Sequence, residues 1–250
     1  MTLPGRAVSR CILPILCLHV GCFSSTDDSA NPGAGGSTTQ DGAPASPAAQ
    51  ELIDDMEDMD GSILAKAGRI GAWYTYNDAT ATGMQKPTVM TPFTMTAGGR
   101  DGAGYAANTV GGGFTVWGAG TGFNLHDPGD GNNGSAKTPY DASAYTGIVF
   151  WAKAGASSTT SLRVNVSDKN TDPAGGICAP ADKCNDHFGK DINLTANWAM
   201  YTMKFDDLLQ LGWGQSFAAL DVAHLYAVQF QVGKATTFDV WLDDVAFLTK

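Results

Sequence analysis

The segment 225–232 alternates between polar and apolar side chains, and this alternation constrains the fold more than any other stretch. Gln229 and Gln231 fall on one face of an extended chain, whereas Val228 and Phe230 fall on the other. Such a pattern predicts a β-strand with one buried and one polar face. The rest of the chain must therefore supply a sheet and a core that cover the apolar side.

A second strand is expected at 238–248, after a short turn. Alternation places four residues on one of its faces: Trp241, Asp243, Val245 and Phe247. A carboxylate in an apolar row is costly unless a metal ion or hydrogen bonds compensate its charge. We therefore expect a compensating partner at Asp243.

Short apolar runs separated by Gly, Asn, Asp and Pro recur along the chain, which contains 31 Gly and only 16% charged residues. The predicted strands are 52–57, 71–76, 91–97, 104–108, 113–117, 147–153, 161–167, 198–205, 225–232 and 238–248. About ten short strands at this spacing predict an all-β protein, an antiparallel β-sandwich. A short helical turn is expected at 205–211.

The N-terminus has the features of an export signal. Arg6 and Arg10 precede an apolar run at 11–20, which is too short to span a bilayer and is followed by Cys22. We interpret residues 1–22 as a lipoprotein signal peptide with Cys22 lipidated, and simple secretion as the alternative. Both predict an exported protein, in the bacterial cell envelope or extracellular, with no membrane contact beyond a lipid anchor.

Residues 23–50 are rich in Ser, Thr, Gly, Ala, Pro and Asp and contain little that could form a core. They are predicted to be a flexible linker, which leaves 51–250 as the folded domain. The net charge of −10 argues against a nucleic-acid partner, because no basic cluster is available to meet phosphates.

Two cysteines fall within the predicted domain. Cys178 and Cys184 are close in sequence, and an exported loop of this kind most often contains a local disulfide. A zinc site is less favoured, because His187 is the one histidine nearby.

Polar residues occupy one face of two predicted strands. Arg163 and Asn165 share a face in one, and Gln229 and Gln231 share a face in the other. Guanidinium and amide groups offer paired donors and acceptors that suit adjacent sugar hydroxyls, although a solvated outer face is the alternative. Aromatic candidates for stacking on a sugar are Trp73, Tyr74, Tyr76, Trp117, Trp151 and Trp213, most of which must lie in the core. Of these, Tyr76 is included in the predicted sugar site.

The loop that follows the Arg163 strand is the most polar part of the domain. Its candidates for ligand contact are Asp168, Asn185, Asp186 and His187, and a disulfide would hold such side chains in place. An ordinary surface loop with a structural disulfide is the alternative.

Carboxylates occur in both the first and the last predicted strands. If the two strands lie side by side, Asp55 and Glu57 meet Asp243. Carboxylate and carbonyl oxygens are the ligands of Ca²⁺, so we predict a structural calcium site there. Ordinary solvation or shared protonation of these carboxylates is the alternative.

Several of these segments together resemble a known family. Ile53-Asp54-Asp55-Met56-Glu57-Asp58 and Trp241-Leu242-Asp243-Asp244-Val245, with strand segments at 105–107, 150–153, 163–166 and 225–230, resemble the galactose-binding-like jelly-roll modules. They are most similar to the family 11 carbohydrate-binding modules of bacterial glucanases. The resemblance implies a jelly roll, a concave face that binds a β-glucan-like polysaccharide, and calcium held by Asp55, Glu57 and Asp243. The Cys178–Cys184 loop departs from the family pattern.

Three functions are compatible with the sequence: non-catalytic polysaccharide binding, a jelly-roll glycoside hydrolase or lyase, and a structural surface protein. Hydrolysis needs two carboxylates roughly 5 to 9.5 Å apart across the bond. Both glutamates, Glu51 and Glu57, lie at the start of the predicted domain, and the best acid–base combination is Asp168 with Asp186 or His187. The binding function is therefore favoured.

The lipoprotein interpretation makes a direct prediction. Replacing Cys22 by Ser removes the thiol that would carry the lipid, so the variant is expected to be released from membranes or to remain unprocessed. Membrane fractionation and the mass of the mature chain measure this. A Cys22→Ser protein that is processed and membrane-bound like the wild type would refute the interpretation.

Overall fold

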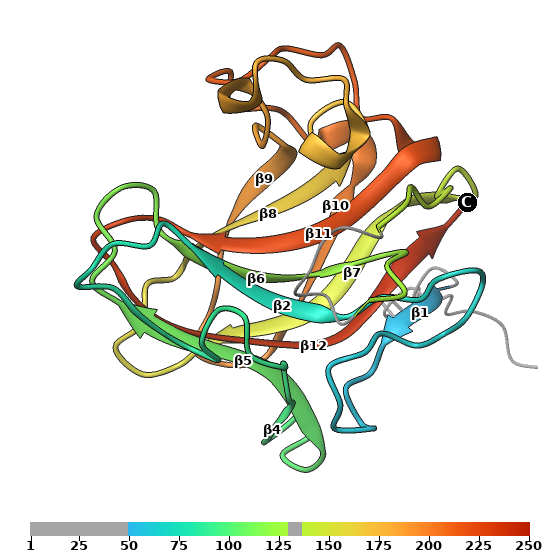
Figure 1. Cartoon of the computed structure of the whole chain (residues 1–250). Helices are drawn as coiled ribbons and strands as arrows, with labels where there is room; N and C mark the ends of the chain where they lie inside the picture. The colour runs from blue at the N-terminus through green and yellow to red at the C-terminus, as the bar shows by residue number, and fades with distance from the viewer. Residues whose placement is uncertain (1–49, 130–136) are drawn as a thin grey trace, which may run out of the picture. The chain divides into compact units, whose positions relative to one another are not determined.

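Two antiparallel sheets pack face to face in the computed structural model (Figure 1). The structure describes residues 50–129 and 137–250. The predicted signal peptide, with Cys22, lies outside the described residues, as does the predicted linker except for its last residue, Gln50, which begins the first strand. The predicted all-β jelly-roll sandwich is confirmed.

The larger sheet has seven strands in the order β10-β7-β12-β5-β3, with β1 paired to β12 and β4 to β5. Its strands are β1 (Gln50–Asp54), β3 (Met84–Lys86), β4 (Thr96–Ala97), β5 (Tyr105–Gly112), β7 (Tyr145–Ala154), β10 (Ala199–Lys204) and β12 (Thr237–Thr249). The predicted pairing of the first and last strands is confirmed, with Leu52 opposite Ala246.

The smaller sheet has five strands in the order β2-β6-β11-β8-β9. They are β2 (Trp73–Asn77), β6 (Ala119–Asn124), β8 (Ser161–Asp168), β9 (Phe188–Asn193) and β11 (Leu225–Val232). Short 3₁₀ helices occur in the connections: η1 (Pro173–Gly175), η2 (Ala181–Lys183), η3 (Phe205–Asp207) and η4 (Val222–His224). The segments between β8 and β9 and between β10 and β11 form a lobe above this sheet (Figure 1).

The core lies between the sheets and is rich in aromatic side chains. Val228, Phe230 and Val232 of β11 enter it, as their alternation predicts. Trp73 of β2 is only 1% exposed and stacks on Phe230 with ring centroids 6.2 Å apart. Burying a large apolar side chain contributes about 1.5–3 kcal/mol, so this row of β11 is a main source of stability.

The prediction that Trp241, Asp243, Val245 and Phe247 share one face of β12 is wrong. Val245 and Phe247 belong to the core, whereas Trp241 does not. The register with β7 shifts between Asp243 and Ala246, and Asp244 has a φ of 44°. This bulge adds a residue on one side and reverses which alternate residues point inward.

The bulge also explains how the charge of Asp243 is accommodated. Burial raises the pKa of Asp243 to about 6, as expected for a carboxylate inside a sheet. Its oxygens accept hydrogen bonds from the backbone N–H groups of Arg100 (2.7 Å) and Asp244 (2.8 Å). The expected compensation therefore includes hydrogen bonds.

Three strands were not predicted: β3, β6 and β9. The sequence of β6 contains Gly120 and Gly122, and that of β9 contains Gly189, and glycine disfavours strands in propensity arguments. In addition, 113–117 forms no strand, and only Thr96–Ala97 of the strand predicted at 91–97 is paired. Within the described ranges, no helix is both long and apolar enough to cross a membrane.

Candidate functional site

Two rows of side chains cross the outer face of the five-stranded sheet. The strand register defines the first row as Tyr74, Gly122, Gln229, Asn165 and Gly189. The second row is Tyr76, Gly120, Gln231, Arg163 and Asp191. The predicted polar faces of the Arg163 strand and the Gln229 strand are therefore neighbours on one surface.

Glycines let the larger side chains of these rows lie flat on the sheet. A Cβ atom on Gly120 would come within 2.5 Å of the Tyr76 ring, and one on Gly189 would collide with the amide oxygen of Asn165. The ring and the amide therefore each occupy space above a glycine of the adjacent strand. The glycines that made β6 and β9 hard to predict from the sequence therefore also leave space for Tyr76 and Asn165 on this surface.

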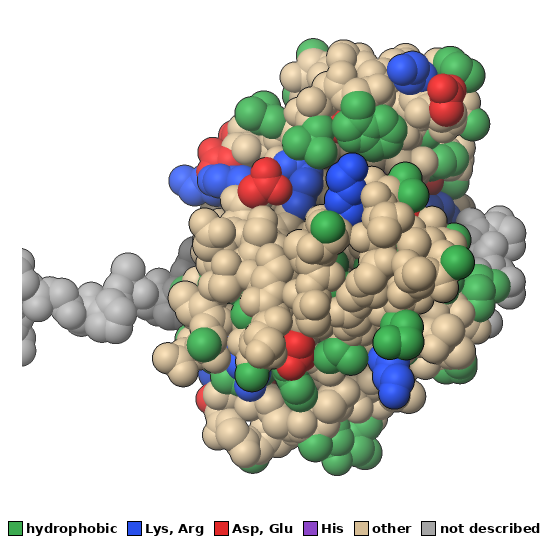
Figure 2. Space-filling view, turned by 90° about the vertical axis from the view of Figure 1, so that its left-hand side faces the viewer, with side chains coloured by type: hydrophobic (Ala, Val, Ile, Leu, Met, Phe, Trp, Pro, Cys, Tyr) green, Lys and Arg blue, Asp and Glu red, His purple; other side chains and the backbone are tan. Residues whose placement is uncertain are grey.

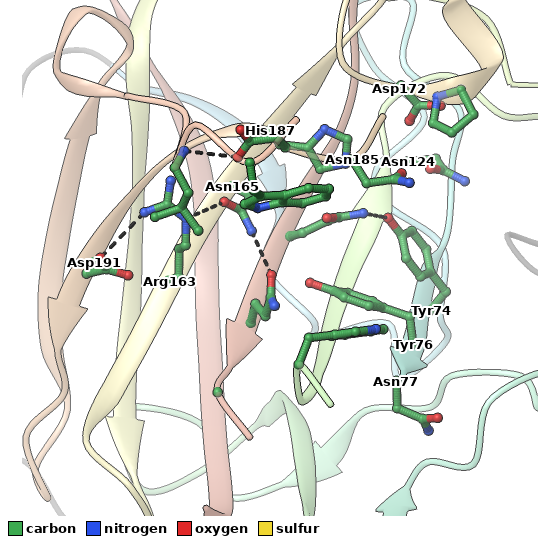
Figure 3. Close-up of a pocket in the computed structure, with 18 of the residues that line it drawn as sticks. Tyr74, Tyr76, Asn77, Asn124, Arg163, Asn165, Asp172, Asn185, His187 and Asp191 are labelled. Carbon is green, nitrogen blue, oxygen red and sulfur yellow. Dashed lines mark hydrogen bonds and ion pairs between the residues drawn. The ribbon is translucent and has the colours of Figure 1, made fainter. Parts of the chain in front are cut away.

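Arg163 is the centre of a hydrogen-bonded chain on this surface (Figure 3). Its Nε donates to Asn165 Oδ1 at 3.0 Å, and Asn165 Nδ2 donates in turn to Gln231 Oε1 at 3.1 Å. Its Nη2 donates to the Leu209 carbonyl at 2.7 Å, and Nη1 reaches Asp191 at 3.5 Å. This series of hydrogen bonds fixes the orientation of Arg163, Asn165 and Gln231 in the absence of a ligand.

The two tyrosines of β2 differ in their hydrogen bonding. The Tyr74 hydroxyl accepts a bond of 2.9 Å from Gln229 Nε2. The Tyr76 hydroxyl is buried and has no partner within the described structure, and burial raises its pKa well above the ordinary value. The Tyr76 ring stacks on Trp117, with centroids 5.9 Å apart. An unpaired buried hydroxyl is costly, so Tyr76 is a candidate for contact with a ligand or an ordered water.

These rows form the floor of a groove of about 1370 Å³. Its walls come from the segment before β6 and from the two segments of the lobe, which contribute Trp117, Asp172, Pro173, Asn185, Leu211 and Trp213. On the face shown in Figure 2, charged side chains gather in a band beside the lobe, and most of the remaining surface is uncharged. The groove lining combines four tyrosine and tryptophan rings and six amide side chains with five charged groups, which are Lys137, Arg163, Asp172, Asp186 and Asp191.

Seven of the eight residues of the predicted sugar site line this groove: Tyr76, Arg163, Asn165, Asp186, His187, Gln229 and Gln231. Asn185, the further candidate in the loop, lines it as well. Asp168 does not. It is fully buried, and its oxygens accept hydrogen bonds from the backbone N–H groups of Thr171 (2.9 Å) and Asp221 (2.8 Å). Asp168 therefore holds the backbone of the segments that follow β8 and precede η4.

The aromatic candidates divide between the groove and the rest of the domain. The groove contains Tyr74, Tyr76, Trp117 and Trp213. Trp73 lies in the core. Trp151 lies under the Arg100 guanidinium, whose Cζ is 5.2 Å from the centroid of the Trp151 ring. Alternation along β2 separates Trp73 from Tyr74 and Tyr76, but the loop tryptophans carry no such signal in the sequence.

The predicted Cys178–Cys184 disulfide is present in the lobe. The loop it closes is joined to the neighbouring segment by two hydrogen bonds of 2.9 Å. Gln215 N donates to the Lys183 carbonyl, and Ala179 N donates to Gln215 Oε1. The disulfide therefore braces both segments that form this wall.

His187 is nearly buried at the edge of the groove. Its Nδ1 lies 2.9 Å from Thr171 Oγ1, and burial lowers its pKa to about 4. The imidazole is therefore neutral at pH 7, so it can act as a hydrogen-bonding group toward a ligand without adding charge.

The predicted calcium ligands do not form one cluster. Within residues 50–129 and 137–250, no three carboxylate, imidazole or thiol groups converge as metal ligands. Asp55 accepts a bond from Glu57 N at 3.3 Å, and Glu57 accepts one from Tyr105 N at 3.2 Å. Asp55 and Glu57 lie just beyond the end of β1, and Asp243 lies opposite Trp151 of β7.

Two backbone carbonyls nevertheless lie near Asp243, on the side of Gly99. The position of a Cβ on Gly99 is 2.7 Å from the Ala103 carbonyl, 3.0 Å from the Tyr105 carbonyl and 3.2 Å from Asp243 Oδ2. A carboxylate with two backbone carbonyls is part of the donor set that Ca²⁺ takes. Three oxygens are fewer than the six to eight that Ca²⁺ takes, and neither Asp55 nor Glu57 is among them. Calcium stays a prediction.

Comparisons with known proteins identify the fold. No protein-family model matches the sequence, and no curated protein matches it. Solved structures do match, and among them is the family 11 carbohydrate-binding module of the cellulosomal cellulase Lic26A-Cel5E of Clostridium thermocellum. That module is 14% identical, with a TM-score of 0.50 over 82% of this chain and 97% of that chain.

Two further structures give the same result. A family 11 module from Clostridium thermocellum in complex with a β-1,3-1,4-mixed-linked tetrasaccharide is 15% identical, with a TM-score of 0.50 over 82% of this chain and 98% of its own. The solution structure of CtCBM11 is 16% identical, with a TM-score of 0.52 over 83% and 99%. The chain therefore has the fold that its resemblance to family 11 carbohydrate-binding modules implied.

The predicted calcium site is testable by its effect on stability. If Asp243 binds Ca²⁺, chelation will lower the melting temperature by several degrees, because an ion that binds only the folded state stabilises it by mass action. Asp243→Ala should abolish the calcium-dependent part, whereas Asp141→Ala at an exposed turn should retain it. A melting temperature that is indifferent to both chelator and calcium would contradict the site.

The buried His187 predicts a pH dependence of known sign. Its pKa is about 4 in the folded domain and about 6.5 when unfolded, so the unfolded chain takes up a proton first as the pH falls. The stability of the wild type relative to His187→Gln should therefore be complete above pH 6.5 and decrease toward pH 4, by on the order of 3 kcal/mol. Urea unfolding of both proteins across this range measures it. Parallel curves would show that His187 titrates normally.

Proposed function

We propose that the domain binds a β-glucan-like polysaccharide in the groove of its five-stranded sheet, without cleaving it. The observation that carries the proposal is the pair of rows across the groove floor, where Tyr74, Tyr76, Arg163, Asn165, Gln229 and Gln231 stand together. Sugars present adjacent hydroxyl pairs on their edges and C–H groups on their faces. Amide and guanidinium groups match the former, and aromatic rings match the latter.

The hydrogen bonds of the floor leave ligand-binding capacity unused. Gln231 takes part in the chain through its oxygen, which leaves its amide N–H groups without a protein partner in the described structure. The Tyr76 hydroxyl is also unpaired. Donors and acceptors that are held in place but not satisfied can bind a hydroxyl at little entropic cost.

The state of the groove carboxylates supports binding over hydrolysis. Asp172 pairs with Lys137 at 2.8 Å, and Asp191 pairs with Arg163. The carboxylate of Asp186 accepts three backbone N–H groups. A glycoside hydrolase requires one carboxyl group that donates a proton and a second that acts as nucleophile or base. Carboxylates already engaged in this way are poorly placed for either task.

The similar folds support the choice of ligand for a first test. One of the family 11 modules with this fold was solved with a β-1,3-1,4-mixed-linked tetrasaccharide. A linear glucan of this kind is long enough to use a groove that crosses all five strands. Mixed-linked β-glucan is therefore the first ligand to test.

We also propose that the domain acts outside the cytoplasm as part of a lipoprotein. The Cys178–Cys184 disulfide is consistent with export, since such bonds persist in oxidising compartments. Cys22 would anchor the chain to the bacterial envelope, with residues 23–50 as the tether. A structural surface protein remains the alternative, and the binding experiment below distinguishes the two.

Truncating a polar group of the floor should weaken binding. Arg163→Ala or Gln229→Ala leaves ligand hydroxyls unpaired, which costs about 1–3 kcal/mol, or roughly tenfold to a hundredfold in affinity. Calorimetry with the mixed-linked tetrasaccharide measures this. Gln229 is the cleaner variant, because its side chain bonds only to Tyr74 and its loss should leave the melting temperature nearly unchanged.

The control is Asn108→Ala, which removes a polar side chain from β5 in the other sheet and should bind as the wild type does. Reducing-sugar release from the polymer tests the hydrolase alternative, and none is expected. Wild-type protein that binds neither this tetrasaccharide nor a panel of other polysaccharides would contradict the proposal. Sugar release that depends on Asp186 would favour the hydrolase.

A further inference from the structure

The groove is bordered by two exposed tryptophans on short loops. Trp117 is 41% exposed and precedes β6, and Trp213 is 50% exposed in the segment between β10 and β11. An exposed aromatic side chain on an untethered loop would lose conformational freedom on binding a ligand, which reduces the affinity it can contribute. How these loops are held therefore bears on how strongly the groove binds.

The Trp117 loop is held by one carboxylate. Asp78 Oδ2 accepts hydrogen bonds from three consecutive backbone N–H groups, those of Val116 (2.8 Å), Trp117 (2.9 Å) and Gly118 (3.0 Å). Desolvation opposes ionisation of Asp78, but its hydrogen bonds from Thr80, Gly118 and Trp117 outweigh this and hold its pKa well below the usual range. Asp78 is thus an anion bound by the backbone that presents the indole.

The Trp213 loop is held in the same way. Asp186 Oδ1 accepts from Leu211 N at 2.9 Å, and Oδ2 accepts from Gly212 N at 2.8 Å and Gly214 N at 3.0 Å. Asp186 is only 2% exposed. Hydrogen bonds that backbone N–H groups donate to a charged carboxylate are about twice as strong as those between neutral groups, so this loop is firmly fixed.

Asp78 and Asp186, each with the loop it holds, lie at diagonally opposite corners of the five-stranded sheet. Asp78 follows the last residue of β2 and Asp186 precedes the first residues of β9, and these are the two edge strands. Through the register of the intervening strands, the end of β2 lies opposite Ala119, whereas the start of β9 lies level with Phe123. A line from one tryptophan loop to the other therefore crosses both polar rows.

We propose that Asp78 and Asp186 are positioning residues that fix Trp117 and Trp213 as stacking platforms at the two ends of the glucan path. This inference rests on the proposed function and extends it, because it assigns the groove an oblique ligand path with an aromatic platform at each end. Neither aspartate contacts the sugar. Each acts through the tryptophan loop that it holds.

The test compares the affinities of Asp78→Asn and Asp186→Asn for the mixed-linked tetrasaccharide. Asparagine has no negative charge, and it replaces one of the two acceptor oxygens with an NH₂ group that cannot accept a hydrogen bond, so each loop should loosen. The expected loss is roughly three- to tenfold per site, as for an aromatic contact worth about 0.5–1.5 kcal/mol. Asp141→Asn is the matched control, since Asp141 bonds Ser143 N in an exposed turn and does not line the groove.

A double-mutant cycle separates positioning from general stabilisation. If Asp186 acts only through Trp213, then Asp186→Asn should cost no affinity in a Trp213→Ala background. Trp117→Ala serves the same purpose for Asp78. A merely structural aspartate would reduce affinity equally in both backgrounds, and that result would overturn the proposal.

A second variant guards against misfolding of Asp186→Asn. A Cβ on Gly214 would lie 2.5 Å from the Asp186 Cβ and 2.7 Å from the Lys183 carbonyl, so Gly214→Ala should displace the loop without altering charge. It should lower affinity in the same way. If Asp78→Asn, Asp186→Asn and Gly214→Ala all bind the tetrasaccharide as tightly as the wild type does, the positioning inference is wrong and the proposed function stands. If the wild type binds no glucan, both are wrong.

Discussion

Strand β11 lies at the centre of the five-stranded sheet, and its two faces serve both layers of the molecule. Val228, Phe230 and Val232 enter the core, so the strand cannot slip by one residue without exposing them. This constraint simultaneously places Gln229 and Gln231 on the outer face. The hydrophobic burial that stabilises the sandwich therefore also fixes the position of the groove floor.

Backbone groups and glycines then shape the surface that β11 defines. The glycines of β6 and β9 let Tyr76 and Asn165 lie flat, at the expense of strand propensity. Asp78 and Asp186 bind the amides of two loops that lie outside the sheets. Carboxylates in this chain are thus used as structural anions, which is a different use from the acid–base pair that a hydrolase needs.

The lobe above the five-stranded sheet is held together by its own contacts. Hydrogen bonds of Gln215 and Asp186 join its two segments, and the Cys178–Cys184 disulfide closes a loop within one of them. Together the two segments form one wall of the groove. A wall fixed in this way narrows the orientations that a bound chain can take. Under the proposed function, the disulfide-bonded loop would therefore help to set which polysaccharides the groove accepts.

The sequence by itself determined the sandwich, the pairing of the first and last strands, the disulfide, and seven of the residues that line the groove, because period-two alternation and cysteine spacing are local signals. It did not reveal β6 and β9, whose glycines are explained only by side chains from neighbouring strands. It placed Trp241 on the same face as Val245 and Phe247, because the bulge that separates them depends on pairing with β7. Contacts between residues far apart in the chain decided which tryptophans border the groove. Such contacts also decided that Asp168 and Asp78 each hold a loop in place. Only the tertiary structure contains those contacts.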